Sequence, residues 1–175
     1  MKTFVEIGSC DFNTLTHLSH HGWKGVIVEP IKKYFDNIPH EENICYVNVA
    51  IGDVDGSTTM WIAPDEVVDV DSDFKGMSTV IEDGHPLLTT EVNVPMMTFD
   101  TLFEMTEVSS IDFLKIDVEG YDGKLLKLFP WHNIKPKFIQ FESKHTNDLD
   151  YVIELLMSNG YHCMVESENT FAILL

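Results

Sequence analysis

Short apolar runs alternate along the chain with longer stretches whose apolar positions recur every three or four residues. The runs have the length and β-branched content of buried strands, and the longer stretches are typical of helices that cover a sheet. The predicted parallel strands are residues 3–7, 25–28, 44–51, 111–116 and 138–141, and the clearest predicted helices are residues 11–20, 122–129 and 148–158. This alternation predicts an α/β fold: a doubly wound, Rossmann-like sheet, mostly parallel, in a three-layer αβα arrangement.

Two regions depart from the parallel pattern. The last predicted strands, residues 161–165 and 170–174, are close enough in sequence to form a C-terminal antiparallel hairpin. The tight turn at residues 52–56 begins a β-rich insert at about 56–97. Because 175 residues suffice for one domain with a full hydrophobic core, we expect a single domain over residues 1–175.

Acidic residues stand at the ends of four predicted parallel strands: Glu6, Glu29, Asp117 and Glu142. In an open α/β sheet, ligands bind beyond the carboxyl ends of the strands, near the point where the strand order reverses. The recurrence therefore predicts an acidic ligand-binding cleft at this edge of the sheet.

The turn after the first strand contains a single glycine, Gly8, and no G-x-G-x-x-G fingerprint. The missing fingerprint disfavours a nicotinamide-dependent oxidoreductase, because the loop lacks the glycines that let the backbone bind a pyrophosphate. Glu29 lies about 20 residues further on, at the end of the second strand, where an acid accepts hydrogen bonds from the ribose hydroxyls of an adenosine ligand.

The most informative segment is residues 112–120, D-F-L-K-I-D-V-E-G. Lys115 lies within an apolar run, and a buried lysine is costly unless it is paired, so we expect a carboxylate partner. Asp117 and Glu119 are two residues apart at the strand's exit, and we expect both to point towards the cleft. They could bind a metal, hold a substrate hydroxyl or act as a base; no ligand spacing here is diagnostic of a metal site, and we predict none.

Composition excludes several classes of function. The net charge of −18, with eleven lysines and no arginine, argues against nucleic acid as a partner. No apolar run approaches the length of a membrane span, and Glu6 interrupts the apolar stretch that a signal peptide requires, so we expect a cytoplasmic protein and no membrane partner. The three cysteines are scattered, which favours reduced thiols.

Residues 112–126, D-F-L-K-I-D-V-E-G-Y-D-G-K-L-L, resemble the hallmark segment of FkbM-type methyltransferases. Four other pieces stand in the order of that family: residues 6–8, 28–30, 48–56 and 140–142. Thr98 to Leu102 stands near the family's helix before the hallmark strand. Together the matching pieces cover about residues 4–142, and the resemblance implies the fold of a class I methyltransferase.

The resemblance also implies S-adenosylmethionine as cofactor and a hydroxyl oxygen as methyl acceptor, on a small molecule or a glycan-like molecule. It implies cofactor contacts from Glu6, Gly8, Ser9, Glu29, Pro30, Ala50, Ile51 and Asp117. Of these, Glu29 would hold the ribose, Ala50 and Ile51 would lie near the adenine, and Asp117 near the methionine end. The candidate catalytic residues, all at or just beyond strand ends, are Asp117, Glu119, Glu142 and His145. His145 has the pKa range that suits a base at neutral pH.

The chain departs from the family at two places. Its first loop has Cys10 to Asn13 where the family has a later glycine, and it starts almost at the first strand. We therefore expect the cleft to be open, or closed by the insert or by a second copy in a homo-oligomer. Two other functions stay open: an inactive module that binds S-adenosylmethionine or a partner, and, less favoured, a nucleotide-binding oxidoreductase.

Overall fold

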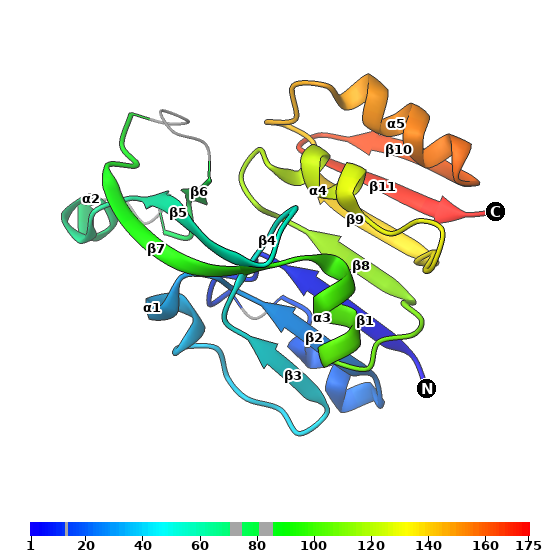
Figure 1. Ribbon diagram of the computed structural model, residues 1–175, viewed down its shortest axis with the longest axis horizontal. Helices are drawn as coiled ribbons and strands as arrows, with labels where there is room; N and C mark the ends of the chain where they lie inside the picture. The colour runs from blue at the N-terminus through cyan, green and yellow to red at the C-terminus, as the bar shows by residue number, and fades with distance from the viewer. Residues whose placement is uncertain (13, 71–74, 81–85) are drawn as a thin grey trace.

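A seven-stranded sheet forms the centre of the computed structural model, which describes residues 1–12, 14–70, 75–80 and 86–175 (Figure 1). Its strands are β1 (Thr3–Ile7), β2 (Lys24–Val28), β3 (Ile44–Val47), β8 (Phe113–Ile116), β9 (Phe138–Glu142), β10 (Tyr161–Glu166) and β11 (Asn169–Leu174). They lie in the order β10-β11-β9-β8-β1-β2-β3. β1, β2, β3, β8 and β9 pair in parallel, and β11 is antiparallel to both of its neighbours. The predicted doubly wound sheet with a C-terminal antiparallel pair is confirmed.

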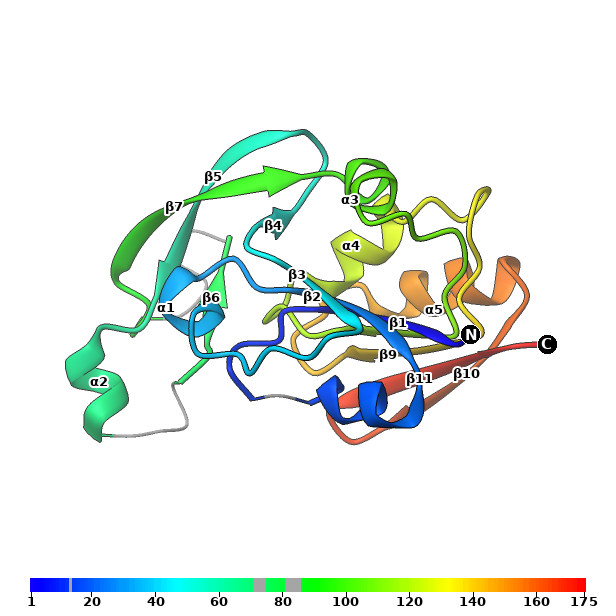
Figure 2. The ribbon, with the colours of Figure 1, turned by 90° about the horizontal axis from the view of Figure 1, so that it is seen from below.

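Helices cover both faces of this sheet (Figure 2). They are η1 (Thr16–His21, a 3-10 helix), α1 (Lys32–Phe35), α3 (Phe99–Met105), α4 (Asp122–Leu128) and α5 (Leu149–Ser158). A further helix, α2 (Asp65–Val70), lies away from this sheet (Figure 1). On one face, Val5 packs in one core with Leu102 of α3, Leu125 of α4 and Val152 of α5. On the other face, Phe4 packs against Leu15 beside η1. Alternate residues of β1 thus face opposite layers, as the two-residue period of a strand requires.

A second, four-stranded sheet lies beyond the carboxyl ends of the central strands (Figure 1). Its order is β4-β7-β5-β6, with bounds Ala50–Ile51, Thr90–Met97, Gly56–Ile62 and Ser78–Thr79. Met60 and Ile62 of β5 share a core with Ile31 and Tyr34, the residues around the start of α1. Within the predicted insert, residues 71–74 and 81–85 lie outside the described residues. None of the described helices has the length and apolar character that a membrane span requires.

Two predicted elements differ in the structure, both next to the cleft. The predicted helix over residues 11–20 is only the short η1, because Thr14 and Leu15 are held by hydrogen bonds to the Glu6 carboxylate. The predicted strand 44–51 breaks at Asn48, whose side-chain amide donates to the carbonyls of Glu29 and Pro30. The residues after the break, Ala50–Ile51, join the second sheet.

Candidate functional site

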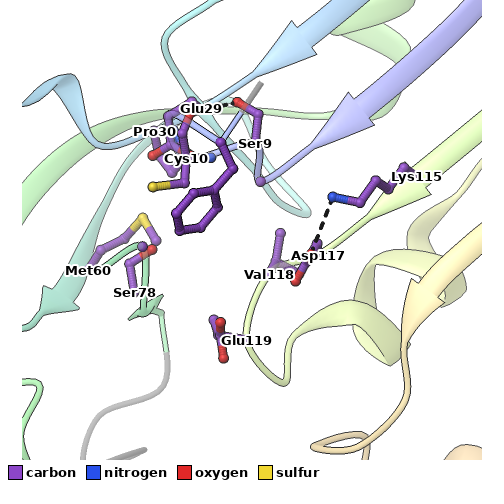
Figure 3. Close-up of a pocket in the computed structure, with 13 residues that line it drawn as sticks. Ser9, Cys10, Glu29, Pro30, Met60, Ser78, Lys115, Asp117, Val118 and Glu119 are labelled. Atoms are coloured by element: carbon purple, nitrogen blue, oxygen red, sulfur yellow. Dashed lines mark hydrogen bonds and ion pairs between the residues drawn. The ribbon is translucent and has the colours of Figure 1, made fainter. Parts of the chain in front are cut away.

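A pocket lies at the carboxyl ends of β1, β2 and β8, where the strand order of the central sheet reverses (Figure 3). Four segments line it: the loops after β1, β2 and β8, and the insert. The lining residues are Gly8, Ser9, Cys10, Phe12, Glu29, Pro30, Met60, Gly76, Ser78, Lys115, Asp117, Val118 and Glu119. The predicted acidic cleft is thus in the place expected for a ligand site in an open α/β sheet.

Gly8 brings the first loop against the end of β8. Its φ is +80°, and a Cβ built on it would lie 1.9 Å from the carbonyl oxygen of Asp117. Its N–H donates to the carbonyl of Val28 at 2.9 Å, which joins the loop to β2. Both the backbone conformation and the lack of space therefore require glycine. Cys10 also has a left-handed backbone, with a φ of +48°, although it is not glycine.

Glu29 is buried at the end of β2, and its carboxylate already accepts two backbone hydrogen bonds. One oxygen accepts from the N–H of Cys10 at 2.8 Å and the other from the N–H of Ile31 at 2.7 Å. Burial raises the pKa of Glu29 to about 7, although these two hydrogen bonds act in the opposite direction. Because each carboxylate oxygen can accept a second hydrogen bond, Glu29 can still receive two hydroxyl donors from the pocket.

A small apolar pocket adjoins the first one, sharing Gly8, Pro30, Met60 and Val118 with it. Its remaining walls are Ile7, Val49, Ala50, Ile51, Val80, Tyr121 and Leu125. The predicted cofactor residues Ala50 and Ile51 are therefore next to the Glu29 pocket but separate from its polar lining. An apolar pocket beside a buried acid suits a flat aromatic group joined to a hydroxylated sugar.

Lys115 and Glu6 form a buried pair under the first loop. The ammonium of Lys115 lies 3.1 Å from Oε1 of Glu6, 3.3 Å from Oδ2 of Asp117, and donates to Oγ1 of Thr14 at 3.3 Å. Burial lowers the pKa of Lys115, but the two carboxylates outweigh it and the net shift is upward. Lys115 thus has two carboxylate partners, Glu6 and Asp117, where the sequence predicted one. Glu6 is fully buried, and the pocket lining in the described part of the chain does not include it.

Glu119, Glu142 and His145 come together beside the pocket, at the ends of β8 and β9. Nδ1 of His145 lies 3.2 Å from Oε1 of Glu142 and 4.0 Å from Oε2 of Glu119. Burial, followed by the charges of Glu142 and Asp117, raises the pKa of Glu119 to about 7. Glu119 lines the pocket, whereas Glu142 and His145 lie next to Glu119 and are not in the lining. Glu119 therefore offers a hydrogen-bond acceptor and proton acceptor to a hydroxyl group in the pocket.

Asp122 was not among the predicted site residues, yet its hydrogen bonds connect the loop after β8 to the end of β9, the two segments that carry this cluster. Its carboxylate is fully buried at the start of α4 and accepts from the N–H of Val118 at 3.4 Å and of Glu142 at 3.3 Å. Burial, and next the charge of Asp117, raises the pKa of Asp122 to about 7. In the sequence, Asp122 is only an acid at the first position of a predicted helix. Acids are common at helix N-termini, so this position alone does not indicate a functional residue.

The insert supplies pocket residues that the sequence analysis did not name. Met60 of β5 and Ser78 of β6 line the pocket across from Asp117 (Figure 3). Gly76 and, from the first loop, Phe12 also line it. No sequence motif marks these residues, because their place in the site depends on how the second sheet packs over the first.

The sequence profile of the methyltransferase FkbM domain matches residues 5–163. No curated protein sequence matches the chain.

The chain is also similar to solved structures of methyltransferase-fold proteins, each about one-tenth identical in sequence. Precorrin-6y C5,15-methyltransferase from Geobacter metallireducens is 11% identical, over 98% of this chain and 78% of that one, with a TM-score of 0.48. A structure of the fibrillarin/Nop5p complex is 12% identical, over 99% of this chain and 72% of that one, with a TM-score of 0.49. Likenesses of this size say nothing about the ligands of this chain.

Proposed function

The chain belongs to the methyltransferase FkbM domain family, and on that premise we propose that it transfers the methyl group of S-adenosylmethionine to a hydroxyl oxygen. The acceptor is a small molecule or a glycan-like molecule. The observation that carries the proposal is that Glu29 and Asp117 both line one pocket, at the point where the strand order reverses.

The cofactor fits the pocket residues in a definite order. Glu29, whose carboxylate is held by the N–H groups of Cys10 and Ile31, would accept hydrogen bonds from the ribose hydroxyls. Ala50 and Ile51 would hold the adenine in the adjoining apolar pocket, and Pro30 lines both pockets. This arrangement leaves the first loop, Gly8 and Ser9, beside the methionine part.

The methionine end of S-adenosylmethionine carries a sulfonium and an ammonium, so it favours nearby carboxylates. Asp117 is the half-exposed carboxylate at this end of the pocket. Lys115 holds Asp117 in place and is itself held by Glu6. In this proposal Glu6 acts on the cofactor through Lys115 and the first loop, not by direct contact.

The acceptor hydroxyl lies on the side of Glu119, Glu142 and His145. Methyl transfer is an in-line displacement, so the oxygen must stand opposite the sulfur, and holding it there supplies much of the rate enhancement. Glu119, which lines the pocket on this side, would orient the hydroxyl and take up its proton. Met60, Gly76 and Ser78 cover the pocket from within the chain, so the proposal needs no second copy to close the cleft. The net charge of −18 disfavours nucleic acid as the acceptor.

Calorimetric titration with S-adenosylmethionine and S-adenosylhomocysteine tests the proposal. We expect both to bind the wild type, and Glu29→Ala and Asp117→Ala each to weaken binding at least tenfold, or about 1.4 kcal/mol. Glu42→Gln is the matched control, because it removes one acid from an exposed position at the opposite edge of the sheet. If the folded wild type binds neither ligand at millimolar concentration, the proposed function is wrong.

A further inference from the structure

The cluster of Glu119, Glu142 and His145 has the spacing of a metal-binding site. One ligand atom from each side chain lies within 4.8 Å of the other two. Glu119 comes from the loop after β8, whereas Glu142 is the last residue of β9 and His145 lies in the loop that follows. These segments are far apart in sequence, so their convergence is a property of the sheet. Two carboxylates and one imidazole make up a ligand set found in divalent-metal sites.

The protein balances the negative charge of this cluster only in part: His145 pairs with both carboxylates, and the charge of Lys144 acts on Glu119 without contacting it. Within the described residues, no lysine forms an ion pair with Glu119 or Glu142: Lys115 contacts Glu6 and Asp117, and Lys144 contacts Glu168. A protonated His145 would offset one of the two carboxylates only. With Asp117 on the same side of the pocket, the site keeps an excess of negative charge that a cation would relieve.

The two loops are held from behind by a buried group. Asp122 accepts the N–H of Val118, which precedes Glu119, and the N–H of Glu142 itself. Such support of ligand-bearing segments is what fixes the geometry of metal sites. In front, Glu119 faces the pocket and the His145 side chain is about half exposed (47%), which leaves a path for an ion to enter.

We propose that Glu119, Glu142 and His145 bind a divalent cation of the Mn²⁺ or Zn²⁺ type. The imidazole favours such an ion over Mg²⁺ and Ca²⁺, which prefer all-oxygen sites. Three protein ligands would leave at least one coordination position open, and one of the three, Glu119, lines the pocket. That this position receives the acceptor hydroxyl rests on the proposed function; the binding of the ion does not.

The test measures metal binding directly, on the full chain without cofactor. Free Mn²⁺ is followed by electron paramagnetic resonance while MnCl₂ is added, with MgCl₂ present in excess. We expect one saturable site in the wild type and at least tenfold weaker binding in Glu142→Gln and in His145→Gln. Glu168→Gln is the matched control: it removes an exposed acid that pairs with Lys144 nearby, and we expect it to bind Mn²⁺ as the wild type does. Thermal melting shows that each variant is folded.

Three results would overturn the proposal: no saturable Mn²⁺ binding to the wild type, equal binding by the wild type and both cluster variants, or an equal loss in Glu168→Gln. A parallel titration with S-adenosylhomocysteine separates this proposal from the proposed function. A protein that binds S-adenosylhomocysteine but not Mn²⁺ contradicts only the metal site. One that binds Mn²⁺ through this cluster but not S-adenosylhomocysteine contradicts only the methyltransferase proposal.

Discussion

Lys115 and Glu6 face each other on neighbouring strands, with their charged atoms 3.1 Å apart and both side chains buried. They lie where β1 meets β8, the two strands between which the order of the sheet reverses. Lys115 also reaches Asp117 at the pocket, and Glu6 also accepts from Leu15 in the segment before η1. This pair therefore joins the sheet, the first loop and the pocket.

Removing Lys115 should destabilise the protein severely. Lys115→Met leaves the Glu6 carboxylate buried without its cation, and breaking a buried ion pair in this way costs on the order of 3–5 kcal/mol. Lys32→Met is the control, because it breaks a pair with Asp36 in which both side chains are exposed, and such pairs contribute about 0–1 kcal/mol. Urea unfolding of both variants measures the difference. Similar losses in the two variants would show that the buried pair has no special role.

Gly8→Ala should disturb the pocket itself. The new Cβ would meet the carbonyl of Asp117 at 1.9 Å, so either the first loop or the β8 exit must move. Gly22→Ala controls for backbone strain alone: Gly22 has nearly the same φ, +78°, and nothing within 4 Å of the built Cβ. We expect Gly22→Ala to cost about 1–2 kcal/mol of stability and to leave binding of S-adenosylhomocysteine intact. Gly8→Ala should cost more and should abolish that binding; retained binding would argue against the proposed cofactor position.

The pKa of Glu29 predicts that cofactor affinity depends on pH. Burial raises this pKa to about 7, the nearby Asp11 carboxylate raises it further, and the Cys10 thiol beside it, with a pKa of about 12, stays neutral. Ribose hydroxyls bind the ionised carboxylate better, so affinity should rise as the pH goes from 6 to 8 and then level off. Methylthioadenosine is the suitable ligand for calorimetry, because it lacks the titrating amino-acid part. Glu29→Gln should bind weakly at every pH; the same pH dependence in that variant would assign it to another group.

Asp122→Asn should separate stability from cofactor binding. The amide can accept only one of the two N–H groups that the Asp122 carboxylate accepts, and the unsatisfied partner costs about 1–3 kcal/mol. The wild-type carboxyl has a pKa of about 7, raised from 3.8 by burial, so the folded state binds its proton more tightly than the unfolded state. Its contribution to stability is therefore present below about pH 4 and is lost as the pH rises to 7.

Urea unfolding between pH 4 and 8 measures this effect. The difference in unfolding free energy between wild type and Asp122→Asn should shrink as the pH rises; Asp150→Asn, at an exposed position, is the matched control for the substitution itself. A constant difference for Asp122→Asn would contradict the assigned pKa. Because Asp122 contacts the loops rather than the pocket, S-adenosylhomocysteine should still bind.

Much of the central sheet could be predicted from the sequence because its strands are continuous apolar runs. For the same reason Lys115 stood out: an ammonium inside such a run needs a partner, and the structure supplies Glu6 and Asp117. Glu29 and Asp117 could also be placed at strand ends, because each directly follows the last residue of an apolar run. The helix predicted from Asp11 was wrong because its residues bind Glu6 instead, a contact that local propensity does not contain.

The sequence by itself determined which residues form the central strands and which acids stand at their ends, since periodicity and local chain length are local properties. Only the tertiary structure decided what those acids contact. It buried Glu6 beneath the first loop, brought Glu119 to within 4.0 Å of His145 across two loops, and placed Met60 of the second sheet over the pocket. These contacts depend on strand order, register and the packing of one sheet on another, which are set by interactions between residues far apart in the chain.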